Sequence, residues 1–250
     1  MNSVMVTRVA ETQWQAVEDD RIVGHGDVSR RPDGRLFVSI DVWQDAAFGR
    51  LGAAILADLP SPLHTLVGEA DIDQKARWEQ LGFTLARREW EYVLPSGPRE
   101  TGLPAGVTIL PDEQVDERLL VALDRAIREE VEATVGWQTM PAEVLPRPAG
   151  TRPVDPSKYT VAVRNGAYVG LVRVAPVRRR ARIGLIAVRA DRQRQGIGRA
   201  LLAHALGSLH RDAGIDSAWA EVDESNTAAM ALIEDIGARR TGSNVELVRR

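Results

Sequence analysis

Hydrophobic positions in the C-terminal half of the chain follow strand spacing and helix spacing in turn. Two short apolar runs, residues 159–163 and 168–174, are separated by Asn165-Gly166, a pair typical of a hairpin turn. A third apolar run at 181–188 also predicts a strand. The pattern then predicts a helix at 197–210, a strand at 215–222, a helix from Ser225 or Asn226 to Asp235, and a strand at 245–248. This order predicts an α+β fold around a mostly antiparallel sheet.

The same pattern occurs once more, earlier in the chain. An offset of 146 residues aligns residues 14–56 with 160–202 without a gap, and Gly24 falls on Gly170. After a further gap of nine residues the matches resume, including Glu79 with Glu234 and Gly82 with Gly237. Glycines and strand valines in one register indicate two copies of one fold.

A stretch dense in glycine and proline separates the two copies. We therefore predict a shortened domain at residues 1–95, a linker at 96–104 and a second domain at 105–250. The second copy has an extra segment, 112–134, whose apolar residues have helical spacing: Leu119, Leu120, Leu123, Ile127 and Val131. The first copy lacks a counterpart for this helix.

The amino-acid composition excludes several kinds of catalytic and metal site. Of 250 residues, 44% are hydrophobic and 27% charged, as in an ordinary globular protein. The absence of cysteine excludes disulfides, zinc–thiolate sites, iron–sulfur clusters and cysteine nucleophiles. The four histidines show no metal-ligand spacing, so we expect no metal.

Charge and hydropathy bear on location and partners. A net charge of −3 gives no general attraction to nucleic acid or to an anionic membrane. No apolar run approaches the roughly 18 residues of a membrane span. The first residues lack the basic-then-apolar order of a signal peptide. We expect a cytoplasmic protein, and the near absence of lysine beside abundant arginine indicates a bacterial, GC-rich source.

The sharpest motif lies in residues 192–202, where a short basic stretch leads from a strand into a helix. Gly196 and Gly198 place backbone N–H groups without a Cβ at the positive end of the helix dipole, an arrangement suited to a pyrophosphate. Residues 177–199 hold eight arginines and one acid, Asp191. A tight strand-to-helix turn beside a solvated charge run is the alternative interpretation.

Three phosphate-binding patterns compete for this loop. A P-loop needs Gly-Lys-Ser/Thr, which the chain lacks. A dinucleotide fingerprint needs a third glycine where Leu201 stands, although Glu221 follows at the distance of a ribose-binding acid. The pattern Gln/Arg-x-x-Gly-x-Gly/Ala is met by Gln193, Gly196 and Gly198.

With this loop, residues 186–188, residues 221–226 and Gly237 in order, the sequence resembles the GNAT superfamily of acyl-CoA-dependent N-acyltransferases. The resemblance is close over 185–238 and looser over both halves. It implies two tandem GNAT-like folds, the N-terminal one degenerate, and transfer of an acetyl group from acetyl-CoA to an amine by direct attack.

The resemblance also implies roles for particular residues. Backbone groups of Ile186, Ala187 and Val188 would pair with the pantetheine arm of acetyl-CoA. The pyrophosphate would lie against the N–H groups of Gln193, Arg194, Gln195, Gly196, Ile197, Gly198 and Arg199. Asn226 would position the pantetheine, or serve as a plain helix cap, or do both.

The proton-handling positions depart from the family. The tyrosine often found seven residues after this asparagine is Ile233, and the glutamate near the start of the fourth strand is Arg182. Glu221, near the end of its strand, is the candidate catalytic base. A surface carboxylate is the alternative interpretation.

The acceptor side is expected near the extra helix. Glu132 and Trp137 are the candidate acceptor-binding residues, with Glu129 and Glu130 beside them, because carboxylates near an aromatic ring can hold a cationic amine. A solvated helix face and a core tryptophan are the alternative interpretation. The proline-rich stretch at 141–156 is a candidate cover.

The first copy departs further from the pattern. Arg50 replaces Gly196, Ala47 replaces Gln193 and Asp71 replaces Asn226. We predict a structural repeat without a cofactor loop, in a monomer with an internal pseudo-dimer or in a homodimer. The expected function is acetylation of a small-molecule amine. A CoA-binding or sensory module without turnover, and a protein N-terminal or lysine acetyltransferase, are the alternatives.

Overall fold

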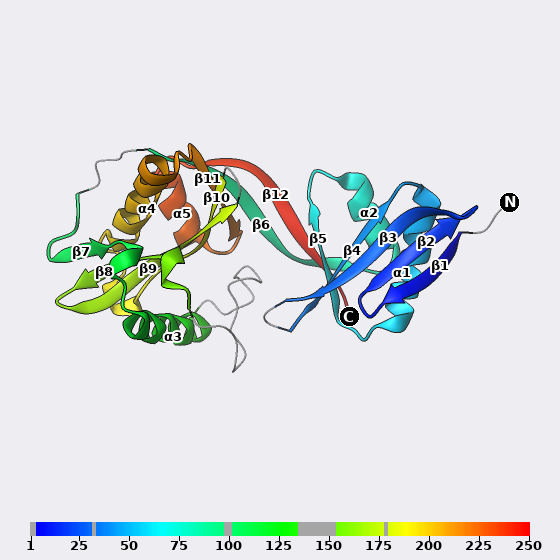
Figure 1. The fold of residues 1–250 in the computed structure, drawn as a ribbon, viewed down its shortest axis with the longest axis horizontal. Helices are drawn as coiled ribbons and strands as arrows, with labels where there is room; N and C mark the ends of the chain where they lie inside the picture. Colours follow the sequence, from blue (N-terminus) through cyan, green and yellow to red (C-terminus); the bar gives the residue numbers. More distant parts are fainter. Residues whose placement is uncertain (1–3, 32–33, 98–101, 135–153, 178–179) are drawn as a thin grey trace. The chain divides into compact units, whose positions relative to one another are not determined.

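The computed structural model describes residues 4–31, 34–97, 102–134, 154–177 and 180–250, and it divides into two compact units (Figure 1). The N-terminal unit comprises Met1–Glu89 with Gly242–Arg250, and the C-terminal unit comprises Trp90–Thr241. The α+β class predicted from the sequence is confirmed, with mixed, mostly antiparallel sheets flanked by helices.

The N-terminal unit is a sheet with two helices. Its elements are β1 (Met5–Ala10), β2 (Gln13–Glu18), β3 (Arg21–Arg30), β4 (Leu36–Val42), α1 (Asp45–Asp58), β5 (Leu63–Gly68), α2 (Ile72–Gln80), the first part of β6 (Thr84–Pro95) and most of β12 (Arg239–Arg249). The strand order is β1-β2-β3-β4-β5-β12-β6. Its core includes Trp78, whose ring packs edge-on against Phe48 and Phe83 with centroids 5.2 and 4.8 Å away.

The C-terminal unit repeats this plan with one more helix. Its elements are the second part of β6, β7 (Val107–Leu110), α3 (Glu117–Ala133), β8 (Tyr159–Arg164), β9 (Ala167–Val177), β10 (Arg180–Val188), α4 (Ile197–Ala213), β11 (Ser217–Asp223), α5 (Thr227–Asp235) and the start of β12. The strand order is β6-β11-β10-β9-β8-β7. Short 3-10 turns lie at Asp112–Gln114, Pro156–Lys158 and Ala190–Arg192.

Apolar side chains of the C-terminal sheet form one cluster with α4 and α5 and another with α3. Buried residues of α4 pack with Ala218, Ala220 and Val222 of β11 in the first cluster. In the second, Leu120, Leu123 and Ile127 of α3 pack against the sheet. Leu119, which the helical spacing also included, is 48% exposed. The side chain of Asp116 caps α3 by accepting the Arg118 and Leu119 N–H groups.

Strand β10 changes face at a β-bulge. Ile183 pairs with Val174 and Leu185 with Arg173, so Gly184 is the extra residue. Ile183 belongs to the cluster around α4 and α5, whereas Leu185 belongs to the cluster around α3. A bulge bends a strand and ends regular pairing, and here it lies just before the residues expected to meet the cofactor.

The elements recur at the offsets found in the sequence. Strands β2 and β8 begin and end at equivalent residues for the offset of 146, as α2 and α5 do for 155. The hairpin register recurs too, since Gly24 pairs with Val42 and Gly170 with Val188. A Cβ at Gly24 would lie 2.8 Å from a methyl of Val42, and one at Gly170 would lie 3.3 Å from a methyl of Val188. In both copies the glycine makes room for the next strand, which is β4 before α1 in the first copy and β10 before α4 in the second.

The compact units do not coincide with the sequence copies, because the copies exchange their last strands. Residues 90–95 of β6 belong to the C-terminal unit, next to β11 in the strand order. The last part of β12, red in Figure 1, pairs antiparallel with β5, with Val245 opposite Val67. The domains predicted at 1–95 and 105–250 therefore differ from the units by these two strand segments. The exchange pairs the edge of β5, which would otherwise be open.

Candidate functional site

Eight residues connect β10 to α4, and their start is fixed by side chains. The Gln193 amide donates to the Val188 carbonyl across 3.1 Å. Glu130 of α3 accepts the Ala190 N–H at 2.8 Å, and its other oxygen lies 3.6 Å from the Arg189 guanidinium. The sequence does not predict this anchor, because Glu130 and Ala190 lie 60 positions apart.

The end of the connection presents backbone donors. Within the described part of the chain, no N–H group from Arg194 to Arg199 donates a hydrogen bond, and the first intrahelical bond runs from Ala200 to Gly196. Arg194 and Gly196 adopt positive φ, 60° and 79°, and so turn the chain into the helix. Six donors at the positive end of a 17-residue helix form an anion-binding cradle.

Gly198 is not required by packing. A Cβ built there would meet a Leu232 methyl at 3.4 Å and a Val188 methyl at 3.7 Å, which are ordinary contacts. At the equivalent Gly52 of the first copy, a Cβ would lie 2.3 Å from a methyl of Leu81. Packing therefore explains the glycine in the first copy only, because a Cβ at Gly198 would make no close contact within the described residues.

Strand β10 has an unpaired edge beside the cradle. It pairs in parallel with β11 at two positions, Ala181 with Ala218 and Arg182 with Trp219. Beyond them, among the described residues, β10 pairs with β9 alone. Ile186, Ala187 and Val188 are half-buried on this stretch. Their edge offers backbone groups to an extended ligand, as an open sheet edge does to an added strand.

Asn226 is the N-cap of α5. Its Oδ1 accepts the Ala229 N–H at 3.1 Å, and its Nδ2 donates no hydrogen bond within the described residues. Asp71 caps α2 of the first copy in the same way, by accepting the Gln74 N–H at 3.0 Å. The capping role is therefore common to both copies, and the amide N–H₂ is what the asparagine adds.

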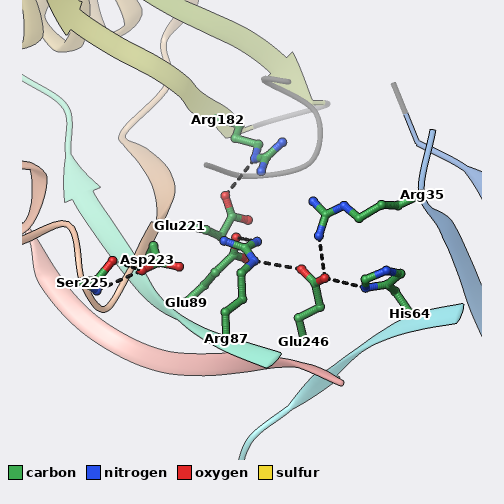
Figure 2. Close-up of polar contacts among 9 residues, drawn as sticks. All are labelled: Arg35, His64, Arg87, Glu89, Arg182, Glu221, Asp223, Ser225 and Glu246. Carbon is green, nitrogen blue, oxygen red and sulfur yellow. Dashed lines mark hydrogen bonds and ion pairs between the residues drawn. The ribbon is translucent and has the colours of Figure 1, made fainter. Parts of the chain in front are cut away.

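Glu221 is held by two neighbours. Its Oε2 accepts from Nε of Arg182 at 2.8 Å (Figure 2), and its Oε1 accepts from Nε1 of Trp219 at 3.1 Å. The alternate residues of β11 pack in the cluster around α4 and α5, so Glu221 projects from the opposite face of the sheet. The candidate base thus forms an ion pair with the arginine that stands where the family often has a glutamate.

The other predicted site residues lie in a core, on an exposed helix face or outside the described residues. Ile233 is 2% exposed within the α4 and α5 cluster, so the family's tyrosine position is a core residue here. Glu132 is exposed on the last turn of α3 and Glu129 is exposed one turn earlier. Trp137 and most of the stretch at 141–156 lie outside the described residues. Of the three glutamates, the structure brings Glu130 to the loop.

The first copy has no such loop. Two residues connect β4 to α1, and the helix begins at Asp45, so the counterparts of the C-terminal loop lie inside α1. Ala47 is fully buried, and Arg50 donates to the Val4 carbonyl at 2.9 Å. The expected loss of the cradle thus comes from an earlier helix start, in addition to the changed side chains.

The N-terminal unit has a buried ionic cluster instead. Glu246 of β12 accepts from His64 at 2.8 Å, from Arg35 at 2.6 Å and from Arg87 at 2.8 Å (Figure 2). Burial raises the pKa of Glu246, but hydrogen bonds from His64 and Arg87 and the charge of Arg35 outweigh it and lower the pKa to about 2. Arg87 also pairs with the buried Glu89, and the carboxylates raise the pKa of Arg87 against the effect of burial.

Comparisons with known proteins bear on the family and on the fold. Residues 124–238 match the model of the acetyltransferase (GNAT) family. The fold is similar to that of a GCN5-related N-acetyltransferase from Sphaerobacter thermophilus, with a TM-score of 0.70, 19% identity and coverage of 97% of this chain and 82% of that one. No curated protein matches the sequence.

Two further solved structures have a similar fold. A tandem GNAT protein from the clavulanic acid biosynthesis pathway has a TM-score of 0.67 and 16% identity, covering 95% of this chain and 82% of that one. A GCN5-related N-acetyltransferase from Kribbella flavida has a TM-score of 0.64 and 15% identity, covering 98% and 89%. The chain therefore has the fold of GNAT proteins, and its second copy contains the segment that matches the family model.

Two further observations concern metal-binding groups and membrane-spanning helices among the described residues. No group of three or more histidine, aspartate or glutamate side chains is placed to hold a metal ion there. No helix within the described ranges has both the length and the apolar content to span a membrane.

Proposed function

We propose that the protein is an acetyl-CoA-dependent N-acetyltransferase that acts on a primary amine of a small molecule. The observation that carries the proposal is the set of six unbonded N–H groups at residues 194–199, next to the unpaired edge of β10. The N–H groups suit a pyrophosphate, and the strand edge suits an extended arm that carries amides. Coenzyme A has both groups, with the pantetheine arm attached to the pyrophosphate.

The residues present fit the cosubstrate. Gly196 and Gly198 leave the cradle open to phosphate oxygens, and Ile186 to Val188 offer backbone groups to the pantetheine amides. The Nδ2 of Asn226 remains available to an acceptor atom while its Oδ1 caps α5. Acetyl-CoA supplies the activated acetyl group as a thioester.

The chemistry requires a bond exchange and one proton transfer. The acceptor nitrogen bonds to the acetyl carbon, the carbon–sulfur bond breaks, and the nitrogen gives up a proton. Holding both reactants in place supplies much of the rate enhancement. Glu221 is the proposed base, with Arg182 holding its carboxylate. The thiolate leaving group has a modest pKa, like that of cysteine, so water can protonate it where Ile233 offers no acid.

A second candidate function has a specific basis. Ile233 is buried and Glu221 is ion-paired, so a CoA-binding module without turnover would keep the cradle and lose proton handling. We favour the enzyme because the cradle, the strand edge and Asn226 are all retained. Acetylation of a protein amine remains the alternative acceptor class.

The first copy is proposed to be a structural repeat that binds no cofactor, because α1 occupies the segment that forms the loop in the second copy. We propose a cytoplasmic protein, either a monomer in which the two copies form a pseudo-dimer or a homodimer. No nucleic acid or membrane partner is expected, given the net charge of −3.

Two measurements test the function. Calorimetric titration should show acetyl-CoA binding to the full chain, and release of free CoA should depend on an added amine. The acceptors tested would be polyamines, aminoglycosides, amino acids and peptides. Tight binding without CoA release on the whole panel would support the non-turnover module. Absence of binding would reject both functions.

A further inference from the structure

Arg173 of β9 is a charged residue that lies between apolar neighbours in the C-terminal sheet. Its cross-strand neighbours are Tyr159 on one side and Leu185 on the other. Both neighbours, like Leu171 two residues earlier, belong to the apolar cluster under α3. The Arg173 side chain therefore leaves the sheet on the α3 face, between two apolar residues.

The guanidinium of Arg173 reaches over β10. A Cβ built on Gly184 would lie 2.9 Å from Nη1 of Arg173, so the group occupies the space that Gly184 leaves at the bulge. Arg173 is half-buried, and within the described residues it forms no hydrogen bond or ion pair. A partly buried cation without a partner loses hydration without compensation, which favours an anionic ligand.

The ion pair beside Gly184 adds no net charge to the surroundings of Arg173. Arg182 lies two residues before Gly184 on β10 and projects to the same face, because Ala181 and Ile183 pack on the other one. Its ion pair with Glu221 leaves the charge of Arg173 uncompensated. A purely cationic polyamine would meet repulsion here, whereas an anionic group would be attracted.

The first copy lacks both features. The counterpart of Arg173 is Asp27, and the counterpart of Gly184 is the buried Val38. Its β3–β4 ladder runs without a bulge from Gly24 opposite Val42 to Arg30 opposite Leu36. The arginine and the space for it thus occur together, and only in the copy that carries the cofactor loop.

We infer that Arg173 binds a carboxylate of the acceptor, so that the acceptor class is a primary amine that also carries a carboxylate, such as an amino acid. The inference rests on the proposed function, because it places the acceptor on the α3 face of the strand whose edge takes the pantetheine arm. The carboxylate orients the acceptor, and its amine remains free to be acetylated.

Matched acceptors test this class. Leucine with leucinamide, and 4-aminobutyrate with propylamine, differ in the carboxylate. The wild-type protein should acetylate the carboxylate member at least about tenfold more efficiently, as expected for a charge-assisted hydrogen bond. Arg173→Gln should remove the preference mainly through KM, and Arg173→Lys should restore part of it. Equal efficiency on both members of each pair, in a protein that acetylates amines, would overturn the inference and leave the proposed function standing.

A binding measurement distinguishes the carboxylate from the phosphates of coenzyme A. N-acetylleucine, titrated into the full chain with and without CoA, should bind at least about tenfold more tightly than N-acetylleucinamide, and Arg173→Gln should abolish the difference. Gly184→Ala should weaken N-acetylleucine in the same direction, because its methyl displaces the guanidinium. If Arg173→Gln instead weakened acetyl-CoA and left N-acetylleucine unchanged, Arg173 would be a cofactor residue and the inference would be wrong. Failure of acetyl-CoA to bind would reject the proposed function, while this titration without CoA would still decide on the carboxylate.

Discussion

The two copies differ most where the fourth strand of each passes into the helix that follows it, β4 into α1 and β10 into α4. In the N-terminal unit two residues separate β4 from α1, whereas eight separate β10 from α4. The last four cross-strand pairs before this point keep the same register in both copies, from Asp27 opposite Ser39 to Gly24 opposite Val42 and from Arg173 opposite Leu185 to Gly170 opposite Val188. A helix that starts six positions earlier is therefore enough to turn exposed N–H donors into intrahelical ones.

The glycines at this junction show that one residue type serves two purposes. Gly52 lies under Leu81 and is required by packing, whereas Gly198 makes only ordinary contacts. A glycine shared by two repeats is thus no evidence for a shared ligand. The environment of the missing Cβ separates the two cases.

The two units also differ in whether their polar residues have hydrogen-bond partners. The N-terminal unit buries Glu246 among Arg35, Arg87 and His64, which is a structural arrangement with no donor loop nearby in sequence. The C-terminal unit keeps Arg173 without a partner in the described residues, and Asn226 with an unused amide. Satisfied buried groups need no further partner, whereas an unsatisfied one calls for an explanation such as a ligand.

The largest expected effect is on the cofactor loop. Gly198→Val should reduce acetyl-CoA affinity at least about a thousandfold, or about 4 kcal/mol, because the side chain enters the space of the phosphate oxygens. Calorimetry measures the affinity, and circular dichroism should show an unchanged fold. Unchanged affinity with a normal spectrum would reject the assignment of this loop.

The next effect is on the buried cluster of the N-terminal unit. The pKa of Glu246 is lowered from 4.5 to about 2, so ionised Glu246 contributes about 3 kcal/mol above pH 4.5, and this contribution is lost as pH falls toward 2. Glu246→Gln should remove about that amount at pH 7 and flatten the stability curve between pH 4.5 and 2. Urea unfolding of the full chain, with hydrogen exchange of β5 and β12 amides, measures it. An unaltered slope in that pH window would show that Glu246 is not the titrating group.

A matched pair of glycine substitutions sharpens the comparison of the junctions. Gly52→Ala should destabilise the protein by about 2 kcal/mol, because its methyl would overlap Leu81. Gly198→Ala should leave stability unchanged or raise it slightly, because alanine favours the helix. Equal destabilisation by both substitutions in urea unfolding would mean that packing explains both glycines.

The smallest expected effect is the loss of turnover when Glu221, the proposed catalytic base, is replaced. Glu221→Gln should lower turnover about tenfold or more, with the loss greatest where the carboxylate must accept a proton, because positioned bases contribute about 10²–10⁴. The control is Glu117→Gln, at an exposed glutamate in the first turn of α3, which should leave turnover unchanged. A Glu221→Gln protein within twofold of wild type at every pH would show that Glu221 only holds Arg182.

Local sequence patterns predicted the parts of the fold that depend on neighbouring residues. The hairpin at Asn165-Gly166, the helix from Ile197 and the cap at Asn226 follow from short-range chemistry, and the structure has all three. The offset of 146 residues then predicted which residues of the first copy correspond to the strands of the second. The roles of Asn226 as a cofactor ligand and Glu221 as the base come from the family resemblance, and both stay predictions.

Other features depend on contacts between distant residues. The exchange of β6 and β12 involves segments 150 positions apart. The sequence of each strand would be the same whether it stayed in its own copy or crossed to the other, so local patterns do not reveal the exchange. The anchor from Glu130 to Ala190 and the ion pair from Glu221 to Arg182 are likewise long-range. Gly184 within a strand does indicate a bulge, but its role emerges only with Arg173 above it.

The stoichiometry of acetyl-CoA binding tests the difference between the two copies most directly. Calorimetric titration of the full chain should give one site, which Gly198→Val removes and which Arg50→Glu leaves intact, because Arg50 lies inside α1. Two sites per chain, or a site that survives Gly198→Val and is lost in Arg50→Glu, would contradict the account.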